Sequence, residues 1–249
     1  MSRPLQIESA GRTHVGRRRT ENEDRFAALD ALGLYLVVDG TGGHPRGDMA
    51  ARLAISTVQS FFDDPSTTWP TGVDASAMRL VAGVKVANDE IRKVAIRAPG
   101  ERPIGATFAG VHVRADGLCV AHVGDSRCYR FRDRELLQLT EDHTLLHDLI
   151  WAGVPLDMAE ARPNKHALTR VLGVRRSVDV TARYEATMPG DIVLLCTDGL
   201  TRVVDNPAIA GILAEGGGLD AMAARLITRA NDNGGPDNVT CVLVRWPLG

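Results

Sequence analysis

Four aspartates of this sequence lie beside apolar runs that have the character of strands. Asp39 follows LYLVV, Asp125 follows VAHVG, Asp198 follows IVLLCT, and Asp237 precedes NVTCVLVRW. Taken singly, these aspartates are explained as turn residues, because Asp-Gly and Asp-Asn are common turn dipeptides. Taken together they predict a cation site, since strands that enter one core can bring their ends together, and clustered carboxylates repel unless cations lie between them.

The ligand types indicate which cations such a site would bind. Carboxylates, a backbone carbonyl and water suit Mg²⁺ or Mn²⁺, whereas histidine and cysteine suit zinc. The candidate ligands here are almost all oxygen atoms. Two such ions a few ångströms apart can bind one water molecule, lower its pKa and hold a phosphoryl group for in-line displacement. The residue types therefore favour a dinuclear phosphohydrolase.

A second group of charged residues lies upstream, in the stretch GRRRTENEDRF. Arg17 and Arg18 are explained as a solvated basic surface. Arg19 differs because acidic residues follow it closely, among them Glu23 and Asp24. An arginine beside a metal-binding acid cluster can hold a phosphoryl group with two parallel hydrogen bonds. Arg19 is therefore a candidate for binding phosphate.

Short apolar runs rich in branched and aromatic residues predict the strands that would position these acids. Residues 110–124 (GVHVRADGLCVAHVG) and 127–139 (RCYRFRDRELLQL) are each typical of a β-hairpin, with turns at 115–117 and 132–134. Consecutive hairpins indicate antiparallel sheets rather than the strand–helix alternation of a doubly wound fold.

Helical periodicity recurs in two pairs of segments. Residues 47–62 and 75–96 form one pair, and residues 206–215 and 218–232 form another. Pairs of helices that flank runs of strands predict a layered α+β sandwich, with two sheets inside and helices outside. No repeat, low-complexity segment or linker divides the sequence, so we expect one domain over residues 1–249.

Residues 141–170 are neither clearly core sheet nor clearly loop. They begin with a capped helical turn and then become polar and proline-bearing. Insertions of this kind between strands often overlie a functional site.

Composition argues against several other classes of function. The 29 basic and 31 acidic residues give a net charge of -2, so no overall field attracts nucleic acid or an anionic membrane. The four cysteines lack C-x-x-C spacing, which argues against a zinc knot or a redox pair. No apolar run approaches the roughly 18 residues that span a bilayer, and the N-terminus lacks a signal-peptide core. We expect a cytoplasmic protein with no nucleic-acid partner and no membrane insertion.

Eight stretches of the sequence carry, in order, a resemblance to a known family. They are RRRTENEDRF, LYLVVDGTGGH, IGATFAGVHV, VAHVGDSRCYRF, LTEDHTLL, LTRVLG, GDIVLLCTDGL and PDNVTCVLV. Each is weak alone, but the ordered set is highly specific and covers nearly the whole chain. The sequence resembles the metal-dependent PP2C-type (PPM family) protein serine/threonine phosphatases, in particular the compact bacterial members.

The resemblance implies a four-layer αββα sandwich, in which two central antiparallel sheets are flanked by helix pairs and the metals lie in a cleft at one end. The expected cofactors are two core ions, Mn²⁺ or Mg²⁺, and a third ion that is held more weakly. Residues 141–170 match a mobile flap that influences substrate choice. The matched metal residues are Asp39, which bridges both core ions, Gly40, which lends a carbonyl oxygen, and the direct ligands Asp198 and Asp237. The other matches are Glu23, which holds metal-bound water, Asp24, which supports it, Asp125, a ligand of the third ion, and Arg19, which binds phosphate.

Two positions depart from the pattern of the bacterial members. Thr41 stands where methionine is usual, and Ala106 stands where a second threonine is usual. Neither position is expected to bind metal, so we expect retained activity, with loop packing as the property open to change.

The histidines match the family pattern less closely than the acids do. Some family members have a histidine general acid directly after the ligand glycine, where Thr41 stands here. His44 lies further along the loop, and it either reaches the leaving oxygen as a catalytic acid or anchors the loop. The remaining histidines, such as His166, show no paired metal spacing and are expected at the surface or in the core.

Three hypotheses about function follow from these residues. The first is a phosphatase in which a metal-bound hydroxide attacks phosphoserine or phosphothreonine directly, without a phosphoenzyme; we expect a monomer that opposes a separate bacterial serine/threonine kinase. The second is a catalytically weak, phosphatase-like regulatory module that binds phosphoproteins; it predicts that a metal acid is missing from the sequence, and none is. The third uses GTGGH as a nucleotide phosphate loop, but this stretch fits neither G-x-G-x-x-G nor the lysine-bearing P-loop.

Overall fold

The core of the protein is formed by strands that make two antiparallel sheets. The computed structural model describes residues 7–42, 46–66, 72–97, 104–114 and 117–246. The strands are β1 (Glu8–His14), β2 (Asp24–Leu29), β3 (Leu34–Thr41), β4 (Gly105–Ala106), β5 (Phe108–Arg114), β6 (Gly117–Val123), β7 (Arg127–Arg132), β8 (Glu135–Gln138), β9 (Thr181–Ala186), β10 (Ile192–Cys196) and β11 (Val239–Arg245). One sheet has the order β1-β11-β10-β7-β8, and the other has the order β2-β3-β5-β6-β9 with β4 beside β3.

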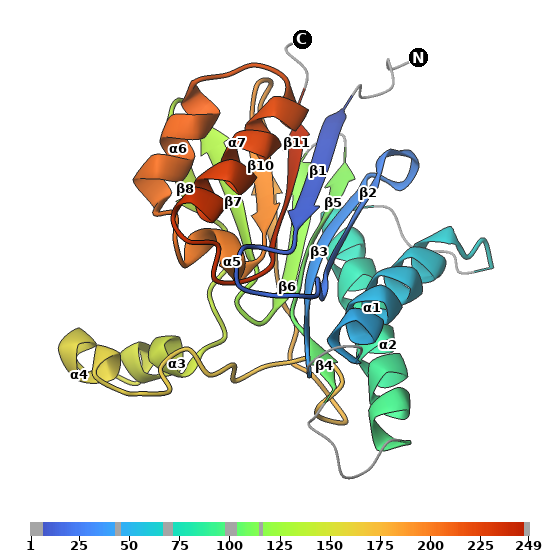
Figure 1. Cartoon of the computed structure of the whole chain (residues 1–249). Coiled ribbons are helices and arrows are strands. Elements are labelled where there is room, and N and C mark those ends of the chain that lie inside the picture. Colours follow the sequence, from blue (N-terminus) through green and yellow to red (C-terminus); the bar gives the residue numbers. More distant parts are fainter. Residues whose placement is uncertain (1–6, 43–45, 67–71, 98–103, 115–116, 247–249) are drawn as a thin grey trace.

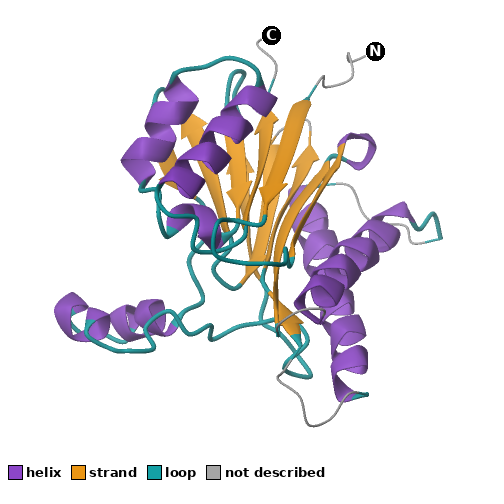
Figure 2. Cartoon of the chain, viewed as in Figure 1, coloured by secondary structure: helices purple, strands orange, loops and turns teal. Residues whose placement is uncertain are grey.

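Two long helices cover the outer face of each sheet (Figures 1 and 2). The helices are α1 (Arg46–Asp63) and α2 (Val73–Ile96) on the β2–β9 sheet, and α6 (Asn206–Ala214) and α7 (Leu219–Asp232) on the β1–β8 sheet. All four lie within a few residues of the segments that helical periodicity predicts. The predicted α+β sandwich, with two sheets inside and helix pairs outside, is confirmed.

Three apolar layers hold these elements together. The middle layer lies between the two sheets and includes Tyr35, Val111, Leu195 and Val242, all at most 1% exposed. Strand β10 contributes to two layers, because Leu195 faces the other sheet while Leu194 faces the α6–α7 side. Burial on both faces explains why this strand is a continuous apolar run rather than an alternating one.

The two predicted hairpins are present as β5–β6 and β7–β8. The second turns at Asp133 and Arg134, which have φ of 51° and 64°. Two consecutive left-handed residues match the twist of antiparallel strands, as in a two-residue type I′ turn. The first two residues of the other predicted turn, 115 and 116, lie outside the described residues.

The pairing of the strands brings the predicted acids to one end of the sandwich. Asp24 at the start of β2 is paired with Asp39 near the end of β3. Cys196, the last residue of β10, is paired with Cys241 near the start of β11, so that the residues just before and after these strands meet. The chain segments that carry the acids therefore converge because of antiparallel register.

Residues 141–170 project from this same end as α3 (Leu145–Trp151) and α4 (Leu156–Glu160), away from the sandwich (Figure 1). The Thr144 side chain caps α3 by accepting a hydrogen bond from the His147 N–H at 3.4 Å, which confirms the predicted capped turn. The base of the segment is closed by a backbone hydrogen bond from the Thr169 N–H to the His143 carbonyl at 2.9 Å.

The shortest helices are α5 (Asp198–Thr201) and the 3-10 helix η1 (Asp30–Leu32). Among the helices of the described residues, none has the length and apolarity needed to cross a membrane.

Burial in the middle layer predicts that Leu195 stabilises the fold more than an exposed leucine does. Leu195→Ala should lower the free energy of unfolding by about 2–5 kcal/mol, because it leaves a cavity between the sheets. Leu137→Ala is the matched control, since Leu137 lies on edge strand β8 and is 45% exposed. The Leu137→Ala substitution should lower the free energy of unfolding by less than about 1 kcal/mol. Urea unfolding at a single pH would compare them, and equal losses would contradict this account of the core.

Candidate active site

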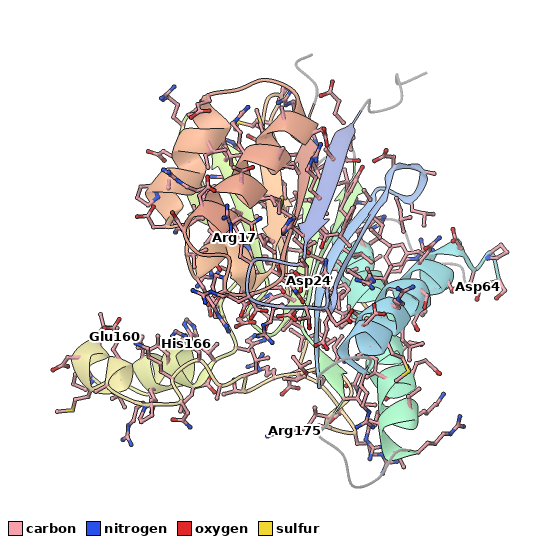
Figure 3. All side chains as sticks on the ribbon, viewed as in Figure 1. Arg17, Asp24, Asp64, Glu160, His166 and Arg175 are labelled. Atoms are coloured by element: carbon pink, nitrogen blue, oxygen red, sulfur yellow. The ribbon has the colours of Figure 1, made fainter. Side chains whose placement is uncertain are left out.

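A cleft of about 500 Å³ opens where the strand ends meet. Seven of the nine residues that the sequence predicts for the site line this cleft: Arg19, Glu23, Asp39, Gly40, Asp125, Asp198 and Asp237. Asp24, also predicted, is only 1% exposed and is not part of the lining. His44 lies outside the described residues. Figure 3 shows Asp24 at this end of the two sheets.

Backbone contacts of β3 hold Asp39 and Gly40 at the cleft. The Asp39 N–H donates to Thr107 Oγ1 at 3.2 Å, and the Thr107 N–H donates to the Asp39 carbonyl at 2.8 Å. A side chain at Gly40 would collide with the backbone carbonyl of Gly47 in α1, so this crossing of strand and helix requires glycine. A side chain at Gly47 would in turn collide with the Glu23 carboxylate and lie 2.7 Å from the Gly40 carbonyl oxygen. The oxygens of Glu23 and Gly40 therefore face the same small space.

Asp24 lies behind this space and is held by two threonines. Its Oδ2 accepts hydrogen bonds from Thr197 Oγ1 at 2.8 Å and from Thr240 Oγ1 at 2.7 Å. The Thr240 N–H also donates to Thr197 Oγ1 at 3.1 Å. This network joins β2 of one sheet to the ends of β10 and β11 in the other, and so couples the two halves of the site.

Asn238 positions the segment that carries Arg19 and Glu23. Its Oδ1 accepts a hydrogen bond from the Glu23 N–H at 2.9 Å, and its Nδ2 donates to the carbonyls of Val15 and Glu21 at 2.8 and 2.9 Å. Asn238 has no role predicted from the sequence. Its position directly after Asp237 is the one local feature that points to the site, because its three hydrogen-bond partners lie more than 200 residues away in the sequence.

Two arginines contact the carboxylates of the cleft. Arg19 Nη2 lies 2.8 Å from Asp237 Oδ2. Arg202 forms an ion pair with Asp198, and its guanidinium nitrogens lie 3.7 Å from Asp125 Oδ2 and 3.8 Å from Asp237 Oδ2. Arg19 is predicted from the sequence, whereas Arg202 is not, although Arg202 lies four residues after Asp198.

His166 is a further cleft residue without a predicted role. It is exposed and, with Leu168, contributes the part of the lining that comes from residues 141–170. Figure 3 labels it on the segment that returns from α4 towards the sandwich. The projecting segment thus forms one wall of the cleft.

Burial and mutual repulsion raise the pKa of the clustered aspartates. Burial and then the charges of Asp24, Asp198, Asp125 and Asp237 raise the pKa of Asp39 well above its usual range. Burial likewise raises the pKa of Asp24 and of Asp125 to about 7 and raises the pKa of Asp198. The charged forms of these carboxylates are costly unless a cation lies close to them.

The donor set fits hard divalent cations. Carboxylate oxygens and the Gly40 carbonyl are the ligands that Mg²⁺ and Mn²⁺ prefer. The four cysteines are all buried, and none lines the cleft. Within the described part of the chain, no three His, Cys, Asp or Glu side chains converge tightly enough to form a ready-made metal site. The two arginines give a physical reason, because they pair with the carboxylates that cations would bind.

Comparisons with known proteins agree with this geometry. The family model described as protein phosphatase 2C matches residues 10–243. The serine/threonine phosphatase stp of Listeria monocytogenes is 34% identical over 241 residues, which cover 95% of each chain.

The chain also resembles solved structures of bacterial serine/threonine phosphatases. The serine/threonine phosphatase of S. agalactiae superposes with a TM-score of 0.87 at 29% identity and covers 96% of this chain and 99% of its own. The phosphatase PstP of Mycobacterium tuberculosis superposes with a TM-score of 0.84 at 32% identity, over 97% of this chain and 99% of its own. The catalytic domain of PstP was also solved in complex with two manganese ions; it is 31% identical, with a TM-score of 0.82 and coverage of 97% of this chain and 98% of its own.

The raised carboxyl pKa values predict how pH affects the protein in chelator. Unfolded aspartates titrate near 3.8, whereas Asp24 and Asp125 keep their protons to about pH 7 in the folded state. The folded state thus binds more protons between these values, and stability is lost as pH rises through 7. The free energy of unfolding in EDTA should fall by about 1 kcal/mol per such carboxyl between pH 6.5 and 8.5.

Urea unfolding at several pH values would test this prediction. The window lies above the usual histidine pKa of 6.5, because buried histidines such as His143, whose pKa burial lowers to about 3, give the opposite slope below it. Saturating Mn²⁺ should remove the loss, since bound cations keep the carboxyls ionised. A stability that stays constant or rises with pH in EDTA would contradict the prediction.

Proposed function

Because the chain belongs to the protein phosphatase 2C family and is a protein serine/threonine phosphatase, we propose that its cleft hydrolyses phosphoserine and phosphothreonine in proteins with two divalent cations. The observation that carries this proposal is the convergence of buried carboxylates and two arginines in one cleft at the end of the sandwich. The relative that was solved with two manganese ions supports the number and kind of ions.

Oxygen donors of the cleft would hold the ions. Asp39, Asp198, Asp237 and the Gly40 carbonyl would bind two core ions, Mn²⁺ or Mg²⁺. When bound, the ions lower the pKa of a water molecule and offset the charge of the phosphoryl oxygens, so that hydrolysis needs no phosphoenzyme. Glu23, whose carboxylate faces the same space as the Gly40 carbonyl, would orient that water.

Two further aspartates would act around these ligands. Asp24, held by Thr197 and Thr240, would support the orientation of Glu23 from behind the cleft. Asp125 is the candidate ligand of a third, weaker ion, and Arg202 already lies 3.7 Å from its carboxylate.

Arg19 would bind and orient the phosphoryl group. Its side chain is 56% exposed, and only Nη2 is engaged by the 2.8 Å contact with Asp237. The guanidinium can therefore present other N–H groups to phosphate oxygens in a bidentate arrangement. For His44 the two predicted roles, catalytic acid or loop anchor, both stay open.

Residues 141–170 would act as a flap that selects substrates. The segment supplies His166 and Leu168 to the cleft wall, and its helices expose large apolar side chains, with Trp151 at 78%, Leu156 at 57% and Met158 at 61%. Side chains of this kind can contact the polypeptide around a phosphorylated residue.

The cellular setting is a further part of the proposal. We propose a single-domain, monomeric, cytoplasmic phosphatase that opposes a bacterial serine/threonine kinase and acts on that kinase or its targets. The alternative, a catalytically weak phosphoprotein-binding module, is not favoured, because every predicted metal acid is present in the sequence.

Removing the negative charge of Asp39 or Asp198 tests whether these residues are metal ligands. Asp39→Asn or Asp198→Asn should reduce Mn²⁺-dependent phosphate release from a phosphothreonine peptide to below about 1%, because the ions lose a bridging or direct ligand. Both variants should fold, and in EDTA they should be at least as stable as the wild type, since one repelled carboxylate is gone. Asp63→Asn, at the exposed end of α1, is the control. Full activity in Asp39→Asn, or in excess chelator, would exclude the mechanism.

The proposed contact of Arg19 with phosphate predicts a specific change in kcat/KM. Arg19→Ala should lower kcat/KM for the phosphopeptide by about 10- to 100-fold, because a charge-assisted phosphate contact is lost. Arg18→Ala removes the same charge from a neighbouring exposed residue and should leave kcat/KM nearly unchanged. Equal effects of the two substitutions would mean that Arg19 acts only through the general charge of the surface.

A further inference from the structure

Arg202 reaches back over the acids from the end of α5. Its backbone N–H donates to the Asp198 carbonyl at 2.9 Å, which completes the last turn of this short helix. Because residues four apart lie on the same side of a helical turn, its side chain pairs with the Asp198 carboxylate. The same guanidinium approaches Asp125 to 3.7 Å and Asp237 to 3.8 Å.

Asp125 and Asp198 are two buried carboxylates that this charge reaches. They are 7% and 6% exposed, so water solvates them poorly. Other nearby arginines are directed elsewhere: Arg19 contacts Asp237, and Arg127 forms two hydrogen bonds with Asp142 at 2.8 and 2.7 Å. Among the ion pairs of the described residues, Arg202 is the partner of both Asp125 and Asp198.

We propose that Arg202 supplies, at Asp125 and Asp198, the positive charge that a third divalent ion would otherwise bring, and so weakens the binding of a third ion relative to the two core ions. The proposal rests on the proposed function, because it concerns the ions of the same cleft. A guanidinium and a divalent cation within about 4 Å of the same two carboxylates repel each other strongly. A third ion must therefore displace Arg202 from these carboxylates before it can bind.

Arginine suits this role better than a bound ion in one respect. The guanidinium is charged at every physiological pH and is tethered to the chain, so its presence does not depend on the metal concentration. Arg202 is 44% exposed, so its side chain has room to turn from Asp198 towards Asp125 when a core ion binds Asp198. Arg202 is thus a positioning residue for the acids rather than a metal ligand.

Counting bound Mn²⁺ tests the proposal without measuring activity. The wild type and Arg202→Gln would be titrated with Mn²⁺, and the free ion would be followed by its electron paramagnetic resonance signal. The wild type should bind two ions tightly and a third only weakly, whereas Arg202→Gln should bind the third ion at least about tenfold more tightly. In Arg202→Gln/Asp125→Asn the third ion should be lost while two remain.

Two controls make the result specific. Arg17→Gln removes an arginine that pairs with Asp232 on the exposed surface and that does not line the cleft, so its ion count should equal that of the wild type. Arg202→Lys keeps the charge and should show a smaller gain than Arg202→Gln. If Arg202→Gln does not fold, judged by circular dichroism, Arg202→Met removes the same charge and is titrated in its place.

Three outcomes would overturn the proposal. They are an unchanged third-ion affinity on neutralising Arg202, a wild type that already binds three ions with similar affinity, and a third ion that survives Asp125→Asn. Phosphate release by the wild type is measured separately. Its absence would refute the proposed function, while the ion count would still decide the role of Arg202.

Discussion

Repulsion among carboxylates that the fold forces together is the constraint on which the site depends. The antiparallel register places Asp24 opposite Asp39, and burial together with neighbouring charges disfavours their ionised forms. Close backbone approaches prevent the acids from moving apart. A side chain at Gly199, for example, would collide with the backbone carbonyl of Asn238, which keeps Asp198 beside the start of β11. The rigid fold thus holds the carboxylates close together at an electrostatic cost, and bound cations lower that cost.

The apolar layer between the sheets holds the strand ends in place against the repulsion between their carboxylates. Residues such as Tyr35, Leu195 and Val242 interlock the two sheets over their length, so the strand ends cannot splay without opening the core. The hydrogen bonds from Thr197 and Thr240 to Asp24 extend the same connection into the polar end. The core and the site are therefore mechanically coupled: the packing fixes how near the acids lie, and their nearness determines which cations they bind.

The sequence revealed the acids and the layers because both have local signatures. An apolar run followed by aspartate identifies Asp39 and Asp198, and hairpin and helix periodicity indicate the sandwich. Asn238 and Arg202 were missed for different physical reasons. The hydrogen bonds of Asn238 join positions that only tertiary structure brings together. Arg202 follows a helix of four residues, which is too short to produce a periodic pattern, so the direction of its side chain is visible only in three dimensions.

The charges of the cleft explain why ions are needed before any chemistry occurs. Its described lining contains six carboxyl groups and two arginines, and full ionisation would leave an excess of four negative charges. Such a cleft repels a phosphate monoester, which itself carries nearly two negative charges at neutral pH. The two divalent cations of the proposed mechanism would balance the excess, and so would help the substrate to enter as well as to react. If Arg202 were neutral, the excess would be five, and the buried pair Asp125 and Asp198 would attract one more cation. The number of bound ions is therefore governed by the balance of acids and arginines, and not by the acids alone.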